Sequence, residues 1–227
     1  MRIKNIIKGD VAFQVKYGFY FVYTIMTFLY ILLLFALPEV VKEKAAIIMI
    51  YTDPAAMGLF FMGAIVLLEK SQRVLNSIAV SPLKVSEYIL SKVISLGLIG
   101  TLVGVILSLF SGSSNIFQVI CGVFMGSVIF SLIGLSVAAK INSLNQFMIV
   151  TVPFELILFL PPLFYLFGYQ KPYMLLHPGC VVIRLLTDEK GFELLPLLIL
   201  IGWILLIYQI TYVIVKKMFQ SVGGVKL

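Results

Sequence analysis

Six long hydrophobic runs follow one another along the chain, separated by short polar segments. Their apolar positions do not alternate with polar ones, which argues against the strands of a membrane barrel. Most of the runs approach the roughly 20 residues that a helix needs to cross a bilayer. We therefore predict an all-α polytopic membrane protein with one six-helix domain over residues 1–227. The predicted spans are Tyr17–Leu37, Pro54–Leu68, Val93–Phe110, Ile116–Ala139, Phe147–Phe167 and Leu195–Val215.

The second predicted span is short. A helix from Pro54 to Leu68 would rise only about 22 Å, less than a hydrocarbon core of roughly 30 Å. Either Ala45–Tyr51 supplies the missing length, or the membrane is locally thin. Asp53 can cap this helix, with Pro54 in its first turn.

Composition supports a membrane protein. The mean hydropathy is +1.11 and only 12% of the residues are charged, which is outside the range of soluble proteins. The net charge of +7 would suggest nucleic acid in a soluble domain. Here it indicates cytoplasmic loops, so we expect membrane lipids and no nucleic acid as partners.

The lysines and arginines predict the orientation. With the N-terminus inside, 12 of the 17 basic residues lie in the cytoplasm and 5 outside, which favours cytoplasmic termini. The inside set is Arg2, Lys4, Lys8, Lys16, Lys70, Arg73, Lys84, Lys92, Lys140, Lys216, Lys217 and Lys226. The outside set is Lys42, Lys44, Lys171, Arg184 and Lys190.

Two segments outside the spans have their own patterns. In residues 1–16, Ile3, Ile6, Ile7 and Val11 share a helical face apart from Lys4 and Lys8, which predicts an interfacial helix on the inner leaflet. A signal peptide is the alternative, but the apolar run starts late and is too long. Residues 168–193 contain an apolar run too short to cross, and we expect a re-entrant segment in the outer leaflet.

The cytoplasmic segment 69–92 predicts a helix, a corner and a second helix. Glu69 and Arg73 have the spacing of an exposed helical ion pair. Pro82 disfavours helix at Ser81, so the first helix should end near Val80. Ser81 can then cap the next helix, which continues into the third span. Such an elbow would contact a partner, whereas the simpler alternative is a solvated loop.

The elbow resembles the cytoplasmic loop of type-2 ATP-binding-cassette (ABC) exporter permeases. The resemblance rests on Glu69-Lys70, Val74-Leu75, Val80-Ser81-Pro82-Leu83, Glu87-Tyr88 and Lys92. Residues 53–64, DPAAMGLFFMGA, resemble the subgroup named for fluoroquinolone export. Chain length, the N-terminal helix, six spans and the outer segment are also similar.

The resemblance implies a transport subunit of the bacterial plasma membrane. Two permeases, identical or related, would pair, and each would bind a cytoplasmic ABC ATPase through Glu69–Val80. The implied coupling residues are Glu69, Lys70, Arg73, Val74, Leu75, Ser81 and Pro82. The chain has no G-x-x-x-x-G-K-[ST] motif, so no cofactor is expected in it and ATP-Mg would be bound by the partner. The cargo would be small hydrophobic or amphipathic molecules.

Four further residues are candidates for a substrate path or gate. Glu155 stands in an uncharged run and could contact a cationic substrate or form a gating hydrogen bond; a structural carboxyl is the equal alternative. Pro161 and Pro162 should break or kink that helix near its outer end. Tyr23 is predicted to be an anchor at the membrane–water interface, and a contact with the substrate is the alternative.

The remaining candidates favour structural roles. His177 is the only histidine, which excludes a multi-histidine metal site, and it stands beside Pro178-Gly179 as a turn residue. Cys121 and Cys180 are far apart in the predicted topology and should be free thiols. An intramembrane enzyme would need catalytic motifs that the sequence lacks, so no catalytic residues are expected. The substrate-binding subunit of an ATP-driven importer is also small and six-span, but the elbow argues against it.

Overall fold

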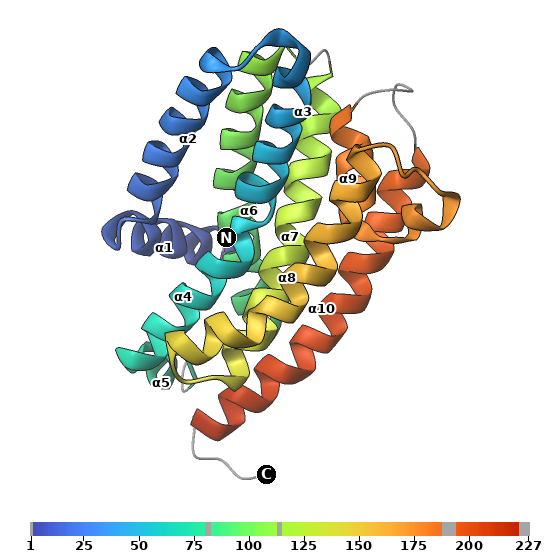
Figure 1. Ribbon diagram of the computed structural model, residues 1–227. Coiled ribbons are helices and arrows are strands. Elements are labelled where there is room, and N and C mark those ends of the chain that lie inside the picture. Colours follow the sequence, from blue (N-terminus) through green and yellow to red (C-terminus); the bar gives the residue numbers. More distant parts are fainter. Residues whose placement is uncertain (1, 80–82, 113–114, 188–193, 223–227) are drawn as a thin grey trace.

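The computed structural model describes residues 2–79, 83–112, 115–187 and 194–222, and this part of the chain forms helices joined by short connections (Figure 1). The α-helices are α1 (Arg2–Lys16), α2 (Phe19–Ala36), α3 (Glu39–Ile50), α4 (Met57–Ser71), α5 (Val74–Ala79), α6 (Val85–Ser111), α7 (Ile116–Lys140), α8 (Leu144–Leu166), α9 (Pro178–Thr187) and α10 (Leu194–Val222). A π-helical turn, η1 (Tyr51–Ala55), joins α3 to α4, and a 3-10 turn, η2 (Pro172–Leu176), precedes α9.

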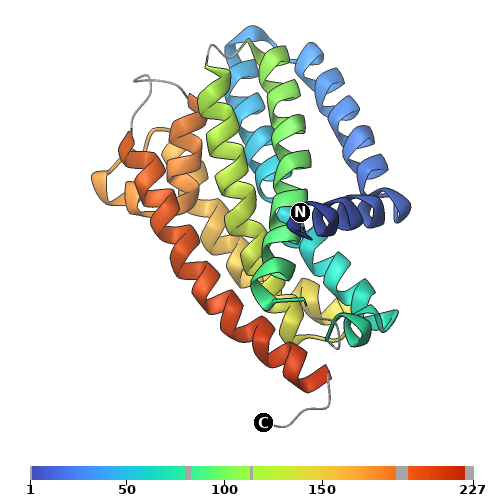
Figure 2. The same cartoon turned by 180° about the vertical axis from the view of Figure 1, so that it is seen from behind.

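Six helices among the described residues are long and apolar enough to cross a membrane, which confirms the predicted class. The second one runs from Glu39 to Ser71 over 33 residues. Ala45–Tyr51 therefore does supply the length that Pro54–Leu68 lacks. Successive spans run in opposite directions through the bundle (Figures 1 and 2).

Asp53 and Pro54 do not begin a helix, contrary to the sequence prediction. They lie inside the second span, within η1, and both are buried. Proline has no N–H to donate and its ring crowds the preceding turn, so an α-helix cannot continue unchanged through Pro54. The wider π turn accommodates the proline without ending the span.

Helix α7 is the centre of the bundle and packs against α4, α6, α9 and α10. Gly134 allows its closest approach to α4, because a Cβ atom at this position would collide with the backbone of Leu59. Small residues bring membrane helices together where apolar burial gives little drive for association.

Helix α8 continues through Pro161 and Pro162, so the predicted break there is wrong. Each proline leaves the carbonyl four residues earlier without its helical donor. For Pro162 this carbonyl belongs to Leu158, and the Tyr51 hydroxyl donates to it at 2.7 Å. For Pro161 it belongs to Ile157, which interacts with His177. A group from outside α8 thus replaces the bond lost at Pro162, and the helix persists.

Residues 168–187 contain η2 and α9, and the side chains of α9 are mostly buried against α7, α8 and α10. Gly179, near the start of α9, packs against Tyr51, Leu158 and Pro162, which all lie in the interior of their spans. Cys180 is buried and, like Cys121, a free thiol, as predicted. Residues 188–193 lie outside the described part of the chain.

Candidate functional site

The first half of the predicted elbow is not one helix. Helix α4 ends at Ser71, and Arg73 takes a left-handed backbone conformation with φ 57° before α5 begins at Val74. The turn lets α5 fold back so that Leu75, only 1% exposed, packs inside the protein, where α5 contacts α4 and α10. The single helix predicted from Glu69 to Val80 is therefore interrupted at Gln72–Arg73. The interruption allows Leu75 to be buried.

The second helix of the elbow begins later in the sequence than predicted. Leu83 and Lys84 are not helical, and α6 starts at Val85 with Lys84 as its N-cap. The Lys84 backbone N–H donates to Glu87 Oε2 at 2.9 Å, a bond that fixes the first turn of α6. The predicted start at Ser81–Pro82 is thus wrong. Ser81 and Pro82 themselves lie outside the described residues.

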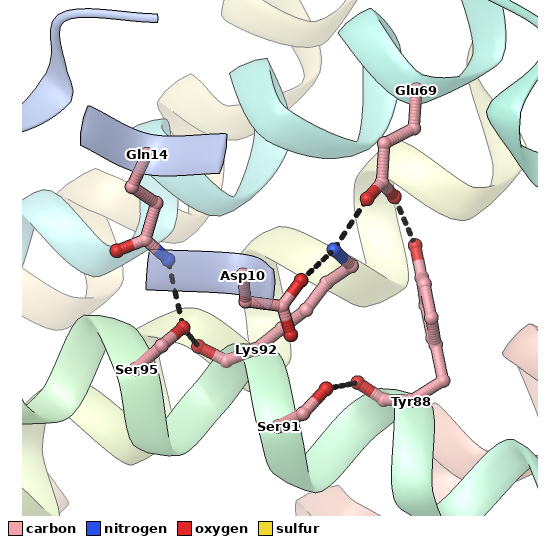
Figure 3. Close-up of polar contacts among 7 residues, drawn as sticks. All are labelled: Asp10, Gln14, Glu69, Tyr88, Ser91, Lys92 and Ser95. Atoms are coloured by element: carbon pink, nitrogen blue, oxygen red, sulfur yellow. Dashed lines mark hydrogen bonds and ion pairs between the residues drawn. The ribbon is translucent and has the colours of Figure 1, made fainter. Parts of the chain in front are cut away.

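Glu69 has partners other than the one expected. Its side chain is buried, with 3% of the residue exposed, and its carboxylate accepts bonds from Lys92 Nζ at 2.6 Å and Tyr88 Oη at 2.8 Å (Figure 3). Arg73 is on the exposed turn. The expected surface pair of Glu69 and Arg73 is therefore replaced by an internal one between α4 and α6.

Lys92 joins three helices at one point. Besides Glu69, its amine contacts Asp10 Oδ1 of α1 at 3.0 Å and lies 4.8 Å from the centre of the Tyr88 ring (Figure 3). Close by, Gln14 of α1 donates to Ser95 of α6 at 2.7 Å. We call Asp10, Glu69, Tyr88 and Lys92 the ionic network. A buried ammonium needs this much compensation, because a lone charge in an apolar interior costs several kcal/mol.

The ionic network also reaches the last span. The Tyr88 ring packs edge-on against Phe219 of α10, with ring centres 5.1 Å apart. Helices α1, α4, α6 and α10 therefore meet behind α5. Helix α5 itself contacts α4 and α10, two of these four helices.

Lys70 closes the end of another helix. Its Nζ donates to the carbonyl oxygens of Ala138, Ala139 and Ile141 at 2.8, 3.0 and 2.7 Å. The last carbonyls of a helix have no donor within it, so Lys70 caps α7 and fixes α4 to it. Its amine is thus engaged within the chain.

The exposed face of the elbow consists of Gln72, Arg73, Asn76 and Ser77. Gln72 is held from α1, because Tyr17 Oη donates to its side-chain oxygen at 2.8 Å. Val74 is half-buried and Leu75 is fully buried, so Arg73 is the most accessible of the implied coupling residues that the structure describes. A partner meeting the described part of the elbow would contact this polar face.

The candidates for a substrate path lie elsewhere in the bundle. Tyr23 is buried against Phe61, with ring centres 4.8 Å apart, so it is not an exposed interface anchor. Glu155 is half-buried, and its Oε1 has no hydrogen-bond partner. Pro162 packs against Gly179 of α9, and Pro161 lies beside it in α8.

Sequence reasoning missed several residues of this site. Asp10 was one of a few scattered acids, and Lys92 was one of many cytoplasmic basic residues. Tyr88-x-x-x-Lys92 at the edge of an apolar run places both groups on one helical face, which is a signal for a buried cation. Nothing in the sequence pairs Lys92 with Asp10 across 82 positions.

Six apolar spans joined by an internal polar network define a polytopic helical membrane protein. A profile of the fluoroquinolones export permease protein family matches residues 1–222. The chain therefore belongs to that family and is an export permease. Two relatives, both named fluoroquinolones export permease protein, come from two strains of Mycobacterium tuberculosis. Each is 22% identical over 204 residues, which cover 84% of this chain and 86% of the relative.

Proposed function

We propose that this chain is the membrane subunit of an ATP-driven ABC exporter and works with a separate cytoplasmic ATPase. The family supports export, and the absence of a Walker A motif from the sequence assigns ATP-Mg binding to another chain. Two permeases, identical or related, pair in the bacterial plasma membrane with their termini in the cytoplasm. The basic residues support this orientation.

The observation that carries the proposal is the ionic network behind α5. The ATPase presses on the exposed face of the elbow, and closure of the ATPase pair moves it. Glu69 and Lys92 pass that movement from α4 to α6, and Asp10 passes it to α1, which lies across the spans (Figure 1). Alternating access then follows from rigid movement of these helices, with α1 on the inner leaflet.

Charge reversal on the elbow tests the ATPase contact. The permease is co-expressed with an ABC ATPase subunit of its own organism, and co-purification and ATPase stimulation are measured. Arg73→Glu should abolish both, because it reverses the charge of an exposed residue at the centre of the described elbow. Lys171→Glu, an exposed lysine on the predicted outer side, is the matched control and should change neither. If Arg73→Glu retains a stimulated complex, the elbow does not hold the ATPase.

The cargo of the pump is proposed to be small hydrophobic or amphipathic molecules, with fluoroquinolones as the class suggested by the relatives' names. Glu155 contacts cationic cargo on this proposal, supported by its position in a span and its unpartnered oxygen. Pro161 and Pro162 place the outer part of α8 against a re-entrant α9, at the outer gate.

A further inference from the structure

A second acid lies within the spans. Asp53 is 2% exposed, and its Oδ2 atom has no hydrogen-bond partner. Among the described residues, no lysine or arginine forms an ion pair with it within 4.0 Å. Ionisable groups inside a membrane are rare and mark ligand or ion pathways when they persist. The π turn that holds Asp53 is a further feature that concentrates at functional sites.

One face of α2 is turned toward this carboxyl group. Tyr23, Thr27 and Tyr30 follow one another at i, i+4 and i+7, which places them on one side of the helix. Asp53 interacts electrostatically with both Tyr23 and Tyr30 of this face. The Tyr23 hydroxyl is also buried and without a partner. The Thr27 hydroxyl, in contrast, already donates to the Tyr23 carbonyl at 2.7 Å.

An apolar cleft reaches this face from the side of the bundle. It has a volume of about 430 Å³ and lies between α2 and α6, with Tyr20, Tyr23, Thr27, Ile99 and Leu102 among its walls. The volume is within the range of small-molecule sites. Only 17% of the α2 span is buried inside the protein, so α2 can move away from α6 at little cost in packing.

We propose that Asp53 and Tyr23 bind the protonated amine of an amphipathic molecule whose apolar part occupies the cleft. The ammonium forms an ion pair with Asp53 Oδ2 and donates a second bond to the Tyr23 hydroxyl oxygen, which satisfies both unpartnered groups. One carboxylate and one phenol do not make a metal site, since no group of three metal-binding side chains occurs in the described ranges. This inference rests on the proposed function and deepens it by naming protonated amines as the cargo class and Asp53 and Tyr23 as their site.

The test uses the purified permease alone in lipid nanodiscs. Dansylcadaverine, a fluorescent primary amine, is compared with its neutral N-acetyl derivative, and binding is followed by dansyl fluorescence. Asp53→Asn should weaken binding of the amine at least about tenfold, as expected for loss of a bond to a charged group, and leave the acetylated probe unaffected. Tyr23→Phe should weaken amine binding by about threefold. An equal effect on both probes would overturn the proposal.

Glu43→Gln is the matched control, because it removes an exposed acid of the same span that does not line the cleft. If Glu155→Gln, and not Asp53→Asn, weakens the amine, the site is on α8 and the proposal is wrong. Should Asp53→Asn fail to fold, dicyclohexylcarbodiimide labelling of the wild-type protein replaces it. Mass spectrometry should then show Asp53 protected by the amine and not by the acetylated probe; equal labelling with both would contradict the site.

No ATPase takes part in these measurements. A negative result would therefore refute the amine site without refuting the proposed ATP-driven export. A pump without this site would still lose ATPase stimulation in Arg73→Glu and show no selective effect of Asp53→Asn. A protein that binds the amine through Asp53 but is not driven by an ATPase would give the opposite pattern.

Discussion

The Lys92 ammonium of α6 lies 2.6 Å from the Glu69 carboxylate of α4, and both side chains are almost fully buried. Asp10 supplies a second carboxylate from α1 at 3.0 Å. The pair is thus more than a local helix contact. It fixes the angle between the two helices that emerge on either side of the elbow.

Replacing Lys92 with methionine should leave two buried carboxylates without their cation. Removal of one partner from a buried ion pair typically costs about 3–5 kcal/mol, so Lys92→Met should lower the midpoint of thermal unfolding in detergent strongly. The double variant Lys92→Met, Glu69→Gln should recover part of the loss, because it also removes a charge. A double variant no more stable than Lys92→Met would show that the pairing is not the source of the effect.

The Lys70 amine should stabilise the end of α7. Lys70→Met removes the donor to three carbonyl oxygens and should cost about 1–3 kcal/mol, measured by thermal unfolding of the purified permease. Lys140→Met is the control, since Lys140 is an exposed lysine at the end of the same helix. Equal behaviour of the two variants would mean that the cap contributes nothing.

Gly134 and Gly202 should respond in opposite ways to alanine. At Gly134 the added methyl group meets the Leu59 backbone, which cannot rotate away, so α4 and α7 must separate at a cost of about 1–3 kcal/mol. At Gly202 nothing lies within 4 Å, and alanine should be neutral or stabilise α10 slightly. Thermal unfolding of both variants checks this, and a stable Gly134→Ala protein would refute the close helix contact.

His177 should make stability depend on pH. Burial lowers the pKa of His177 below its ordinary 6.5, and the Ile157 carbonyl partly opposes this. Between 6.5 and the lower folded value, the unfolded chain binds more protons than the folded one, so stability falls as the pH drops through this window. Above about pH 7.5 both states are neutral and the contribution is constant.

His177→Asn provides the measurement. The difference in unfolding midpoint between the wild-type protein and this variant, recorded from pH 8 to pH 5, should be flat at high pH. Below pH 6.5 the midpoint of the wild-type protein should fall relative to that of the variant. This comparison cancels the titration of other groups. A difference that stays constant over the whole range would show that His177 has an unaltered pKa.

The sequence by itself determined the class of protein and the approximate spans. Apolar runs of bilayer length report directly on transfer into lipid, and this property belongs to each segment independently of its neighbours. The residues around Glu69 and Asp53 also sufficed to indicate an exporter family. These conclusions depend on local composition and on motifs within one segment.

Only the tertiary structure decided what the polar groups do. Glu69 finds Lys92 rather than Arg73 because a carboxylate in an apolar interior must take whichever donor the packed helices bring to it. Pro162 leaves α8 intact because Tyr51, 107 positions before Leu158, replaces the missing donor. Asp53 became a buried acid because the π turn η1 carries the second span through Pro54, from α3 to α4. Such partners are far apart in sequence, and no local pattern specifies them.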